Sequence, residues 1–490
     1  MQTQDAKWTI CPKCQGRGKI NKGLRKKVRL RFQRELDLFE KSNGEGPVPI
    51  RPKAHLDICT HCKGSGLVAS SSILPINENY PHVAIIGGGI GGVALAVACQ
   101  HRGIPFTLYE RDNGFEARSQ GYGLTLQQAS RAIAGLGLYS LADGVVSTRH
   151  IVHNTDGKAL GEWGVRSLGP QDERIVPKRT NIHIARQSLR QELLQQLDER
   201  YQDQDAVQHQ NVVRWNHQLV DLQERSSDGK QGFDLSFLVN GEIQSAHADL
   251  VVGADGIRSF VRKLLIDEQT SPLRYLGCLV ILGICPLSEI AVDDRSLLDA
   301  ATVFQTANGN ERIYVMPYKS DSVMWQLSFP MAEDTAKALS ALGPQALKDE
   351  AFKRCQWHQP IPQIIAATES TQVSGYPVYD RALLAAEHLP ATAPITLIGD
   401  AAHPMSPFKG QGANQALLDA LSLARTITRR CRVASFWQEE GLRATVLAEF
   451  EEEMLQRSSK KVTESAEAAD FLHSESVLHE SDAPRGRHVK

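Results

Sequence analysis

The stretch HVAIIGGGIGGVALAVACQHRGIPFTLYERD, residues 82–112, decides how most of this chain folds. A short apolar run opens it, a glycine-rich segment follows, and a second apolar run ends at Glu110. This order predicts a strand from His82 to Ile86, then a helix, then a second strand from Thr107 to Tyr109. Apolar runs without alternation are typical of strands that are buried on both faces of a parallel sheet. The stretch therefore predicts one β-α-β unit of such a sheet.

The glycines of this unit, Gly87, Gly89 and Gly92, have the spacing GxGxxG. The first glycine allows a tight turn, the second lets a pyrophosphate approach the backbone, and the third lets helix and strand pack closely. The free amides and the dipole of the helix N-terminus favour that anion. Glu110 suits the hydroxyls of a ribose and would repel a 2′-phosphate. The unit therefore predicts a bound dinucleotide of the FAD or NAD type.

Two later stretches carry carboxylates at the ends of predicted buried strands. DLVVGADGIRSFVRKLL begins at Asp249 and brings Asp255 to the end of its strand. PITLIGDAAHPMSPFKGQGANQALLDALSLA begins at Pro394 and does the same for Asp400. Cofactors bind beyond the carboxyl ends of strands in open α/β sheets. The loop over residues 407–412 then leads into a helix whose first amides suit a developing negative charge.

These three motifs, in this order across residues 82–425, resemble the single-component FAD-dependent aromatic hydroxylases, the group A flavoprotein monooxygenases. The stretches YERDNGFEARSQGYGLTL and IHIARQSLRQELLQQL, with the GDAAHPMSPFKGQGANQALLDAL segment, are most similar to the salicylate-hydroxylase-like branch, which includes the tetracycline-inactivating monooxygenases. The resemblance implies FAD as the cofactor, NAD(P)H as a transient reductant, and O2 activation through a flavin hydroperoxide. It implies insertion of one oxygen atom into an aromatic or polycyclic phenolic small molecule. An FAD-dependent epoxidase or reductase on the same fold is the alternative.

The resemblance also implies roles for individual residues. Glu110 would bind the adenosine ribose and Asp400 the ribitol, while Asp255 would lie between the flavin and nicotinamide-related groups. Lys409 departs from the small residue expected at its position. His183, the histidine nearest to a predicted flavin contact, either orients or deprotonates a phenol or is a polar packing residue, so no catalytic base is assigned. The full predicted cofactor-binding set is Gly87, Gly89, Gly92, Glu110, Arg118, Arg186, Asp255, Asp400, Pro407, Gly410, Gly412 and Ala413, with a structural salt bridge as the alternative for each arginine.

The predicted fold class is α/β, with a Rossmann-like FAD-binding domain of the para-hydroxybenzoate-hydroxylase type. A β-sheet substrate domain is interleaved with it, because the strand-like segments GCLVILGICP, ATVFQTANGNERIYVMPY and DSVMWQLSFP lie between its motifs. In the resembled family such a sheet covers the flavin and forms the substrate pocket. The predicted limits are 1–75 for a zinc-binding module, 80–145, 179–262 and 391–430 for the FAD-binding domain, 146–178 and 263–390 for the substrate domain, and 431–490 for a C-terminal helix and tail.

The front of the chain carries a repeated pattern of cysteine and glycine. CPKCQGRGKI, residues 11–20, and CTHCKGSGLV, residues 59–68, each follow CxxCxGxG. Two such turns supply four thiolates for tetrahedral zinc, and their glycines let backbone amides point at the sulfurs. The repeats resemble those of the DnaJ-type cysteine-rich domain. The predicted ligands of one closed, structural zinc site are Cys11, Cys14, Cys59 and Cys62, with a redox-sensing dithiol or a scaffold as the alternative.

Between the two repeats, the segment KGLRKKVRLRFQRELDLFEKS predicts a helix. Leu24, Val28, Phe32, Leu36 and Phe39 recur at helical spacing and form one apolar stripe. Basic residues crowd the first half of the segment. We interpret the helix as docked by its stripe with a solvated basic face, and a contact with an acidic protein partner or with nucleic acid as the alternative.

The composition limits the class of protein. The chain has 490 residues, 41% hydrophobic and 23% charged, with a net charge of -1. A near-neutral chain has no overall field directed at nucleic acid or anionic membrane, so nucleic acid is not the expected partner. The first ten residues lack the apolar core of a secretory signal, and the apolar run over 83–98 is short and rich in glycine, so no membrane span is predicted. We expect a cytoplasmic protein whose five scattered cysteines are reduced core residues.

Overall fold

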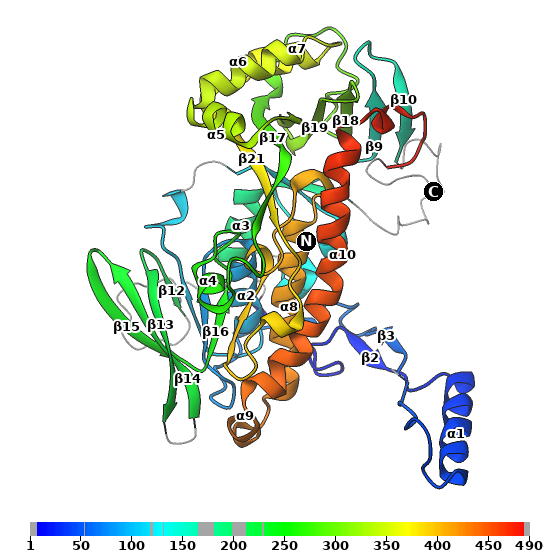
Figure 1. Cartoon of the computed structure of the whole chain (residues 1–490), viewed down its shortest axis with the longest axis vertical. Helices are drawn as coiled ribbons and strands as arrows, with labels where there is room; N and C mark the ends of the chain where they lie inside the picture. Colours follow the sequence, from blue (N-terminus) through cyan, green and yellow to red (C-terminus); the bar gives the residue numbers. More distant parts are fainter. Residues whose placement is uncertain are drawn as a thin grey trace. The chain divides into compact units, whose positions relative to one another are not determined.

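The computed structural model describes residues 7–52, 54–117, 121–130, 132–164, 181–197, 212–227 and 230–484. The chain separates into two compact units, Met1–Pro75 and Ile76–Lys490. Each unit is described by itself, and Figure 1 labels their elements.

A five-stranded parallel sheet forms the centre of the larger unit. Its order is β12-β6-β5-β16-β22, with every neighbouring pair parallel. The strands β5, β6 and β16 are buried along their whole length, as their unbroken apolar runs predict. The bounds are β5 Val83–Ile86, β6 Phe106–Tyr109, β12 Val212–Arg214, β16 Leu250–Gly253 and β22 Ile395–Leu397. The predicted α/β fold with a Rossmann-like sheet is confirmed.

Helices pack on this sheet and position its glycine-rich turns. The helix α2, Ile90–Gln100, follows β5 and contacts both α8, Gly412–Arg430, and α3, Arg186–Leu194. The helix α2 is apolar on nearly all sides, and ten of its eleven residues are therefore buried. The short helix α4, Phe260–Leu265, follows β16.

The second large sheet of this unit is a mixed sheet of seven strands. Its order is β10-β9-β18-β19-β20-β17-β21, and only the β18–β9 pair is parallel. The helices α5 and α6 contact β17 and β21, α7 contacts β17, and all three lie on the outer side of the sheet in Figure 1. The bounds are β9 Arg149–His153, β10 Ala159–Trp163, β17 Leu273–Pro286, β18 Thr302–Ala307, β19 Arg312–Lys319, β20 Ser322–Pro330, β21 Val373–Arg381, α5 Glu333–Ala341, α6 Pro344–Arg354 and α7 Ile361–Ala367. The strand segments predicted to form a separate sheet are all part of it.

Two smaller sheets complete the larger unit. One joins β7, Gly123–Leu126, to β11, Ile182–Ala185, and β8, Val145–Val146. The other is the predicted meander of β13, Gln218–Ser227, β14, Lys230–Val239, and β15, Glu242–Ala248. Asn240 and Gly241 turn β14 into β15 with φ of 51° and 89°, the left-handed pair that a two-residue hairpin requires.

The C-terminal part is helical, in several pieces. The helix α9 spans Ala434–Glu440, a π-helical turn spans Arg443–Leu447, and α10 spans Ala448–Leu472. The long helix α10 contacts α8 at one level and β17 at another, so it links the two sheet systems (Figure 1). Among the residues that the structure describes, no helix is long and apolar enough to cross a membrane.

The smaller unit consists of two β-ribbons and one helix. The strands β1, Lys7–Ile10, and β4, Leu67–Ser70, pair with each other, as do β2, Lys19–Asn21, and β3, Leu56–Ile58. The helix α1, Lys26–Lys41, forms where the apolar stripe predicts it, but none of its residues is buried. The interpretation that the stripe docks the helix is therefore wrong for this unit. The buried cluster holds the four cysteines, with Ile20 and Val68 packed against it, and no residue of α1 belongs to it.

Candidate active site and metal centre

A cavity of about 1330 Å³ lies in the larger unit. Its wall includes Gly89 at the start of α2, Asp400 after β22, the loop 404–413 before α8, and one face of the seven-stranded sheet. Pockets for a single drug-sized molecule measure about 300–1,000 Å³. The cavity is therefore large enough for more than one small-molecule group.

The glycine-rich turn has the close contacts that its spacing predicts. Gly87 has a φ of 110°, and a side chain on it would lie 2.6 Å from the carbonyl oxygen of Ala254. A Cβ on Gly92 would lie 1.9 Å from the carbonyl oxygen of Gly87, so only glycine lets α2 pack here. Glu110 is buried and accepts hydrogen bonds from the Gly88 amide at 2.7 Å and the Asp112 amide at 3.0 Å. Glu110 thus holds the turn in place from the end of β6.

Two arginines of α3 approach this turn. Arg186, the first residue of α3, lines the cavity, and its guanidinium lies 5.7 Å from the centre of the Tyr122 ring. Arg190, one helical turn later, is buried and donates from Nε to the carbonyl oxygen of Gly88 at 2.7 Å. Sequence reasoning missed Arg190, although its i+4 spacing from Arg186 places both on one face of the helix. Arg118, also predicted to contact the cofactor, lies outside the described residues.

Asp400 lies in the short turn Gly399–Ala401 that follows the buried strand β22, and it lines the cavity. Its side chain keeps exposed surface because it looks into the cavity, while protein surrounds it on the other sides. Burial raises the pKa of the Asp400 carboxyl above its ordinary value, and the nearby His403 and Arg186 oppose that shift. Gly412 leaves room beside it, since a Cβ there would lie 3.5 Å from Asp400 Oδ1.

A buried network that sequence reasoning missed supports the turn at Asp400. Asp419 of α8 accepts from the Gly399 amide at 2.8 Å and lies 2.7 Å from His403 Nε2. Arg457 of α10 donates to its other oxygen at 2.8 Å. Burial alone would raise the pKa of Asp419, but His403 and Arg457 bring it below the ordinary value. The carboxylate is thus charged, paired and fixed behind the cavity wall.

The loop before α8 is held by Asn414. Its Oδ1 accepts from the amides of Gln127 and Ala129 at 2.9 and 3.1 Å, and its Nδ2 donates to the carbonyls of Thr125 and Gly410 at 2.9 and 2.8 Å. Gly410 has a φ of 58°, the left-handed conformation that favours glycine. The predicted residues Pro407, Gly410, Gly412 and Ala413 all line the cavity, as does Lys409.

The motif around Asp255 supports α4 and the loop that follows β22. Its carboxylate accepts from the amides of Phe260 and Val261 at 2.7 and 3.2 Å, so it caps α4, and it is not among the residues that line the cavity. Its neighbour Arg262 donates to the carbonyl oxygen of Ala401 at 2.8 Å. The motif therefore braces the loop after β22, and its placement gives no support to a flavin contact by Asp255.

His183 lies on β11 at the cavity wall and is fully buried. Its Nδ1 is 3.0 Å from Thr125 Oγ1 and its Nε2 is 2.8 Å from Ser147 Oγ. Burial, with a smaller contribution from His150, lowers the pKa of His183 to about 3. With both ring nitrogens engaged by hydroxyl groups, this placement favours polar packing over proton transfer.

One face of the seven-stranded sheet forms the far wall of the cavity. Side chains alternate along β19, so Arg312, Tyr314 and Met316 line the cavity, whereas Ile313 and Val315 lie in the apolar core behind the sheet. Neighbouring strands add further side chains to this wall, namely His150, Trp163, Gln305, Met324 and Gln326. The sequence did not allow these residues to be assigned, because the strand pairing sets which of them face one place.

Comparison with known proteins identifies the larger unit. Residues 80–457 match the family described as FAD binding domain, which is more than half of the chain. The chain belongs to this family. Aurachin C monooxygenase/isomerase of Stigmatella aurantiaca is 31% identical to it over 348 residues, which cover 71% of this chain and 80% of that protein. A 3-amino-4-hydroxybenzoate 2-monooxygenase of Streptomyces platensis is 28% identical over 354 residues, with coverage of 71% and 80%.

The solved structures agree with this family. The crystal structure of the tetracycline destructase Tet(51) superposes with a TM-score of 0.54 at 16% identity, over 81% of this chain and 92% of that chain. At this identity the likeness shows the shared fold alone. The predicted resemblance is confirmed, and the chain is an FAD-dependent monooxygenase of the aromatic-hydroxylase type.

The flavoenzyme's cavity has the groups that FAD needs. The first amides of α2 and α8 have no carbonyl partner within their own helices, and both helix starts line the cavity. Gln411 lines it as well, and within the described residues its buried Oε1 has no hydrogen-bond partner. An anion at α2 and a hydrogen-bonding ring edge at α8 fit these two ends.

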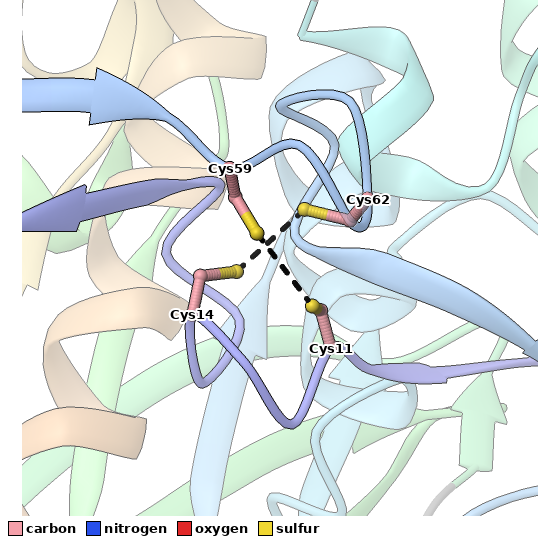
Figure 2. A group of neighbouring side chains, drawn as sticks. All are labelled: Cys11, Cys14, Cys59 and Cys62. Atoms are coloured by element: carbon pink, nitrogen blue, oxygen red, sulfur yellow. Dashed lines mark hydrogen bonds between the residues drawn. The ribbon is translucent and has the colours of Figure 1, made fainter.

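The smaller unit brings the four predicted cysteine ligands together. Figure 2 shows their sulfurs pointing toward one another from the two knuckles, and the four Sγ atoms lie within 4.8 Å of one another. Cys11 Sγ is 4.0 Å from Cys59 Sγ, and Cys14 Sγ is 3.6 Å from Cys62 Sγ. Zinc–sulfur bonds of ~2.3 Å at tetrahedral angles place sulfurs about 3.8 Å apart. The donor set therefore fits zinc, and the cysteines form no disulfide.

The two knuckles have the same backbone hydrogen bonds to sulfur, as the repeated sequence pattern predicts. The amide of Gly18 donates to Cys14 Sγ at 3.2 Å, and the amide of Gly66 donates to Cys62 Sγ at 3.3 Å. A Cβ on Gly66 would lie 2.4 Å from the carbonyl oxygen of Gly16, so the knuckles meet at their glycines. Hydrogen bonds of this kind stabilise metal-bound thiolates.

Proposed function

We propose that this flavoenzyme inserts one oxygen atom from O2 into an aromatic, phenolic or polycyclic small molecule bound in the cavity, with NAD(P)H as the reductant. One observation carries the proposal: a single cavity joins the starts of α2 and α8 and the carboxylate of Asp400 to a wall of aromatic, thioether and amide side chains. The known relatives supply the reaction class, since both are monooxygenases.

We assign the cofactor to the sheet side of the cavity. Gly87, Gly89 and Gly92 let the pyrophosphate approach α2, with Glu110 and Arg190 fixing that turn. Asp400 and Arg186 would hold the middle of the cofactor, and Pro407 and the backbone over 410–413 would flank its ring. Bound FAD accepts two electrons from NAD(P)H and activates O2.

The residues of the chain would position the cofactor and the substrate and would exclude water from the cavity. Asn414 fixes the loop, so the amides at the start of α8 would be available to the edge of a bound flavin ring. Met316 and Met324, together with Trp163 and Tyr376, give the substrate side an apolar surface that displaces water. The sheet wall then holds a flat substrate against the ring.

Turnover with product analysis tests this function. The purified yellow protein is mixed with NADH or NADPH, with and without hydroxybenzoates, quinolones and tetracyclines, and products are measured by mass. Faster nicotinamide oxidation and a product heavier by one oxygen atom are expected for one class. Oxidation that no compound stimulates, with hydrogen peroxide as the sole product, would contradict the proposal and favour a reductase. The same assay separates NADH from NADPH.

In this proposal, the parallel sheet and its helices bind the cofactor, and the seven-stranded sheet covers the substrate. Segments 80–145, 179–262 and 391–430 would bind FAD, segments 146–178 and 263–390 would cover the substrate, and 431–490 would join them. The contacts of α10 with α8 and β17 support the last assignment.

We further propose that the smaller unit binds one structural zinc ion through Cys11, Cys14, Cys59 and Cys62. Four thiolates leave no open coordination position, so this metal would take no part in oxygenation. Residues 1–75 contain 15 Lys and Arg against 6 Asp and Glu, and α1 is not buried. These charges support an acidic protein as a partner. The cytoplasmic location stays a prediction from the sequence.

A further inference from the structure

The helix α1 has an apolar stripe that is not buried in the smaller unit. Val28, Phe32, Leu36 and Phe39 follow one another every three or four residues, so they share one face of the helix. No residue of α1 is buried, and Val28 is 38% exposed. Short helices are marginal in water, and most of their stability in proteins comes from packing of an amphipathic face. We therefore expect another surface to cover this stripe.

The residues on both sides of the stripe carry charges of both signs in a definite order. Arg29 and Arg31 flank its first half, and Glu35 and Glu40 flank its second half. Eleven residues make about three turns of an α-helix, so Arg29 and Glu40 lie on one side of the stripe, and Arg31 and Glu35 lie on the other. Arg31 pairs with Glu35 of its own helix at 2.8 Å. Among the described residues, Arg29 and Glu40 form no ion pair.

Much of the excess positive charge of α1 lies on the opposite side of the helix. Lys27, Arg34 and Lys41 follow one another every seven residues, which places them in one row about half a turn away from the stripe. A contact made by the stripe would leave this row in solvent, where salt screens its charges. The row would stay available to the acidic protein partner proposed above.

We propose that the stripe of α1 binds the stripe of α1 in a second copy of this chain, with the two helices antiparallel. In this order Val28 of each helix lies opposite Phe39 of the other, and Phe32 lies opposite Leu36. The stripe is centred between these residues, so the same surface fits itself after a two-fold rotation. Self-complementary contacts of this kind form most homodimers.

The charges beside the stripe favour the antiparallel order. That order places Arg29 of each helix next to Glu40 of the other, so the pair of helices gains two contacts between opposite charges. A parallel order would place Arg29 next to Arg29 and Glu40 next to Glu40, and like charges at such flanking positions select against a pairing. The inference goes beyond the proposed function and does not rest on it, because α1 belongs to the smaller unit.

Sedimentation equilibrium of the full-length, zinc- and FAD-loaded protein tests the inference. The mass of one chain is 54.0 kDa. The mean mass is expected to rise from this value toward twice this value between about 1 and 100 µM, because an interface of two short helices is small and weak. Phe32→Asp is expected to weaken the association at least ~10-fold, since it places a charge at the centre of the contact. Lys27→Glu, on the outer row of the same helix, is the matched control and should not weaken it.

An exchange of charges separates this pairing from every other contact. Arg29→Glu and Glu40→Arg should each weaken self-association about 3- to 10-fold at low salt, because each variant brings like charges together twice. An equal mixture of the two variants should restore the association. In the mixed pair, one helix carries two acidic residues and the other carries two basic residues at these positions. Neither substitution touches the stripe, so loss of the helix does not explain the result.

Three results would overturn the inference. The first is a protein that stays monomeric at 100 µM, whether the larger unit or an acidic protein then covers the stripe. The second is a dimer that Phe32→Asp leaves intact, since that dimer uses another surface. The third is a mixture of Arg29→Glu and Glu40→Arg that associates no better than either variant alone, which would exclude the antiparallel order.

Discussion

The α-carbon of Gly92 faces the carbonyl oxygen of Gly87 so closely that a Cβ on Gly92 would lie 1.9 Å from that oxygen. The contact joins the first turn of α2 to the residue that follows β5 and fixes the loop between them. The approach of a pyrophosphate to this loop therefore depends on a residue that does not itself need to touch it.

Gly92→Ala is expected to reduce FAD affinity by at least ~10-fold and to lower the melting temperature, because a backbone contact must shift. FAD content after gel filtration and thermal unfolding measure both effects. Gly114→Ala is the matched control, since a Cβ there would meet no atom within 4 Å and Gly114 does not line the cavity. Equal loss of FAD in both variants would contradict the role of the Gly92 contact.

Asn414→Ala is expected to lower the free energy of unfolding by about 2–4 kcal/mol, because it leaves one buried and three half-buried backbone groups without their partner. We also expect weaker flavin binding, since the loop over 407–413 loses its anchor. Urea unfolding and FAD titration measure the two effects. Asn310→Ala, at an exposed turn, should change neither. Unchanged FAD affinity in a destabilised Asn414→Ala protein would contradict the anchoring role.

A fall in pH is expected to destabilise the protein already at pH values well above those at which carboxyl groups titrate. Burial lowers the pKa of His101 and of His183 to about 3, against 6.5 for an ordinary histidine. Below pH 6.5 the unfolded chain takes up protons that the folded chain does not, so the free energy of unfolding falls by up to about 1.4 kcal/mol per pH unit for each histidine. Urea midpoints at pH 7, 6 and 5 measure this slope.

The His183→Asn variant isolates one of these contributions. It should lose stability less steeply with falling pH than the wild type, whatever its stability at pH 7. The same variant tests the catalytic alternative: a turnover profile that keeps its pH dependence is expected if His183 only packs. Identical slopes of unfolding in both proteins would show that His183 is not buried neutral.

The zinc site is expected to be independent of flavin chemistry. Cys11→Ser with Cys59→Ser should lose the one zinc ion per chain, measured by elemental analysis, and with it solubility or assembly. The flavin spectrum of folded material should stay unchanged. Cys355→Ala, at a buried cysteine outside the cluster, should keep its zinc. Lost flavin turnover in a still-folded double variant would show that the smaller unit serves the reaction.

The sequence allowed prediction of those features that depend on neighbours along the chain. The glycine turn, the knuckle amides and the buried strands β5, β16 and β22 follow from local pattern, and the structure has them. Asp419 and Arg312 were beyond reach, since their partners Arg457 and Gln305 are set by packing between separate elements. Arg190 could have been suspected from its i+4 spacing to Arg186, although its partner Gly88 could not. The docking of α1 was wrong within its own unit, because an apolar stripe does not say which surface will cover it.

The order of strands in the parallel sheet has a consequence for how the protein is made. β5 and β16 lie side by side, and β22 completes the edge, yet β22 begins at Ile395. At a synthesis rate of ~5–20 residues per second, the first strands wait on the order of 15–60 s for the last one. The smaller unit can close as soon as Ser70 has left the ribosome and a metal ion is present. A ribosome-bound chain would thus carry a folded N-terminal unit ahead of a long, apolar body whose central sheet stays incomplete until Leu397 has been synthesised.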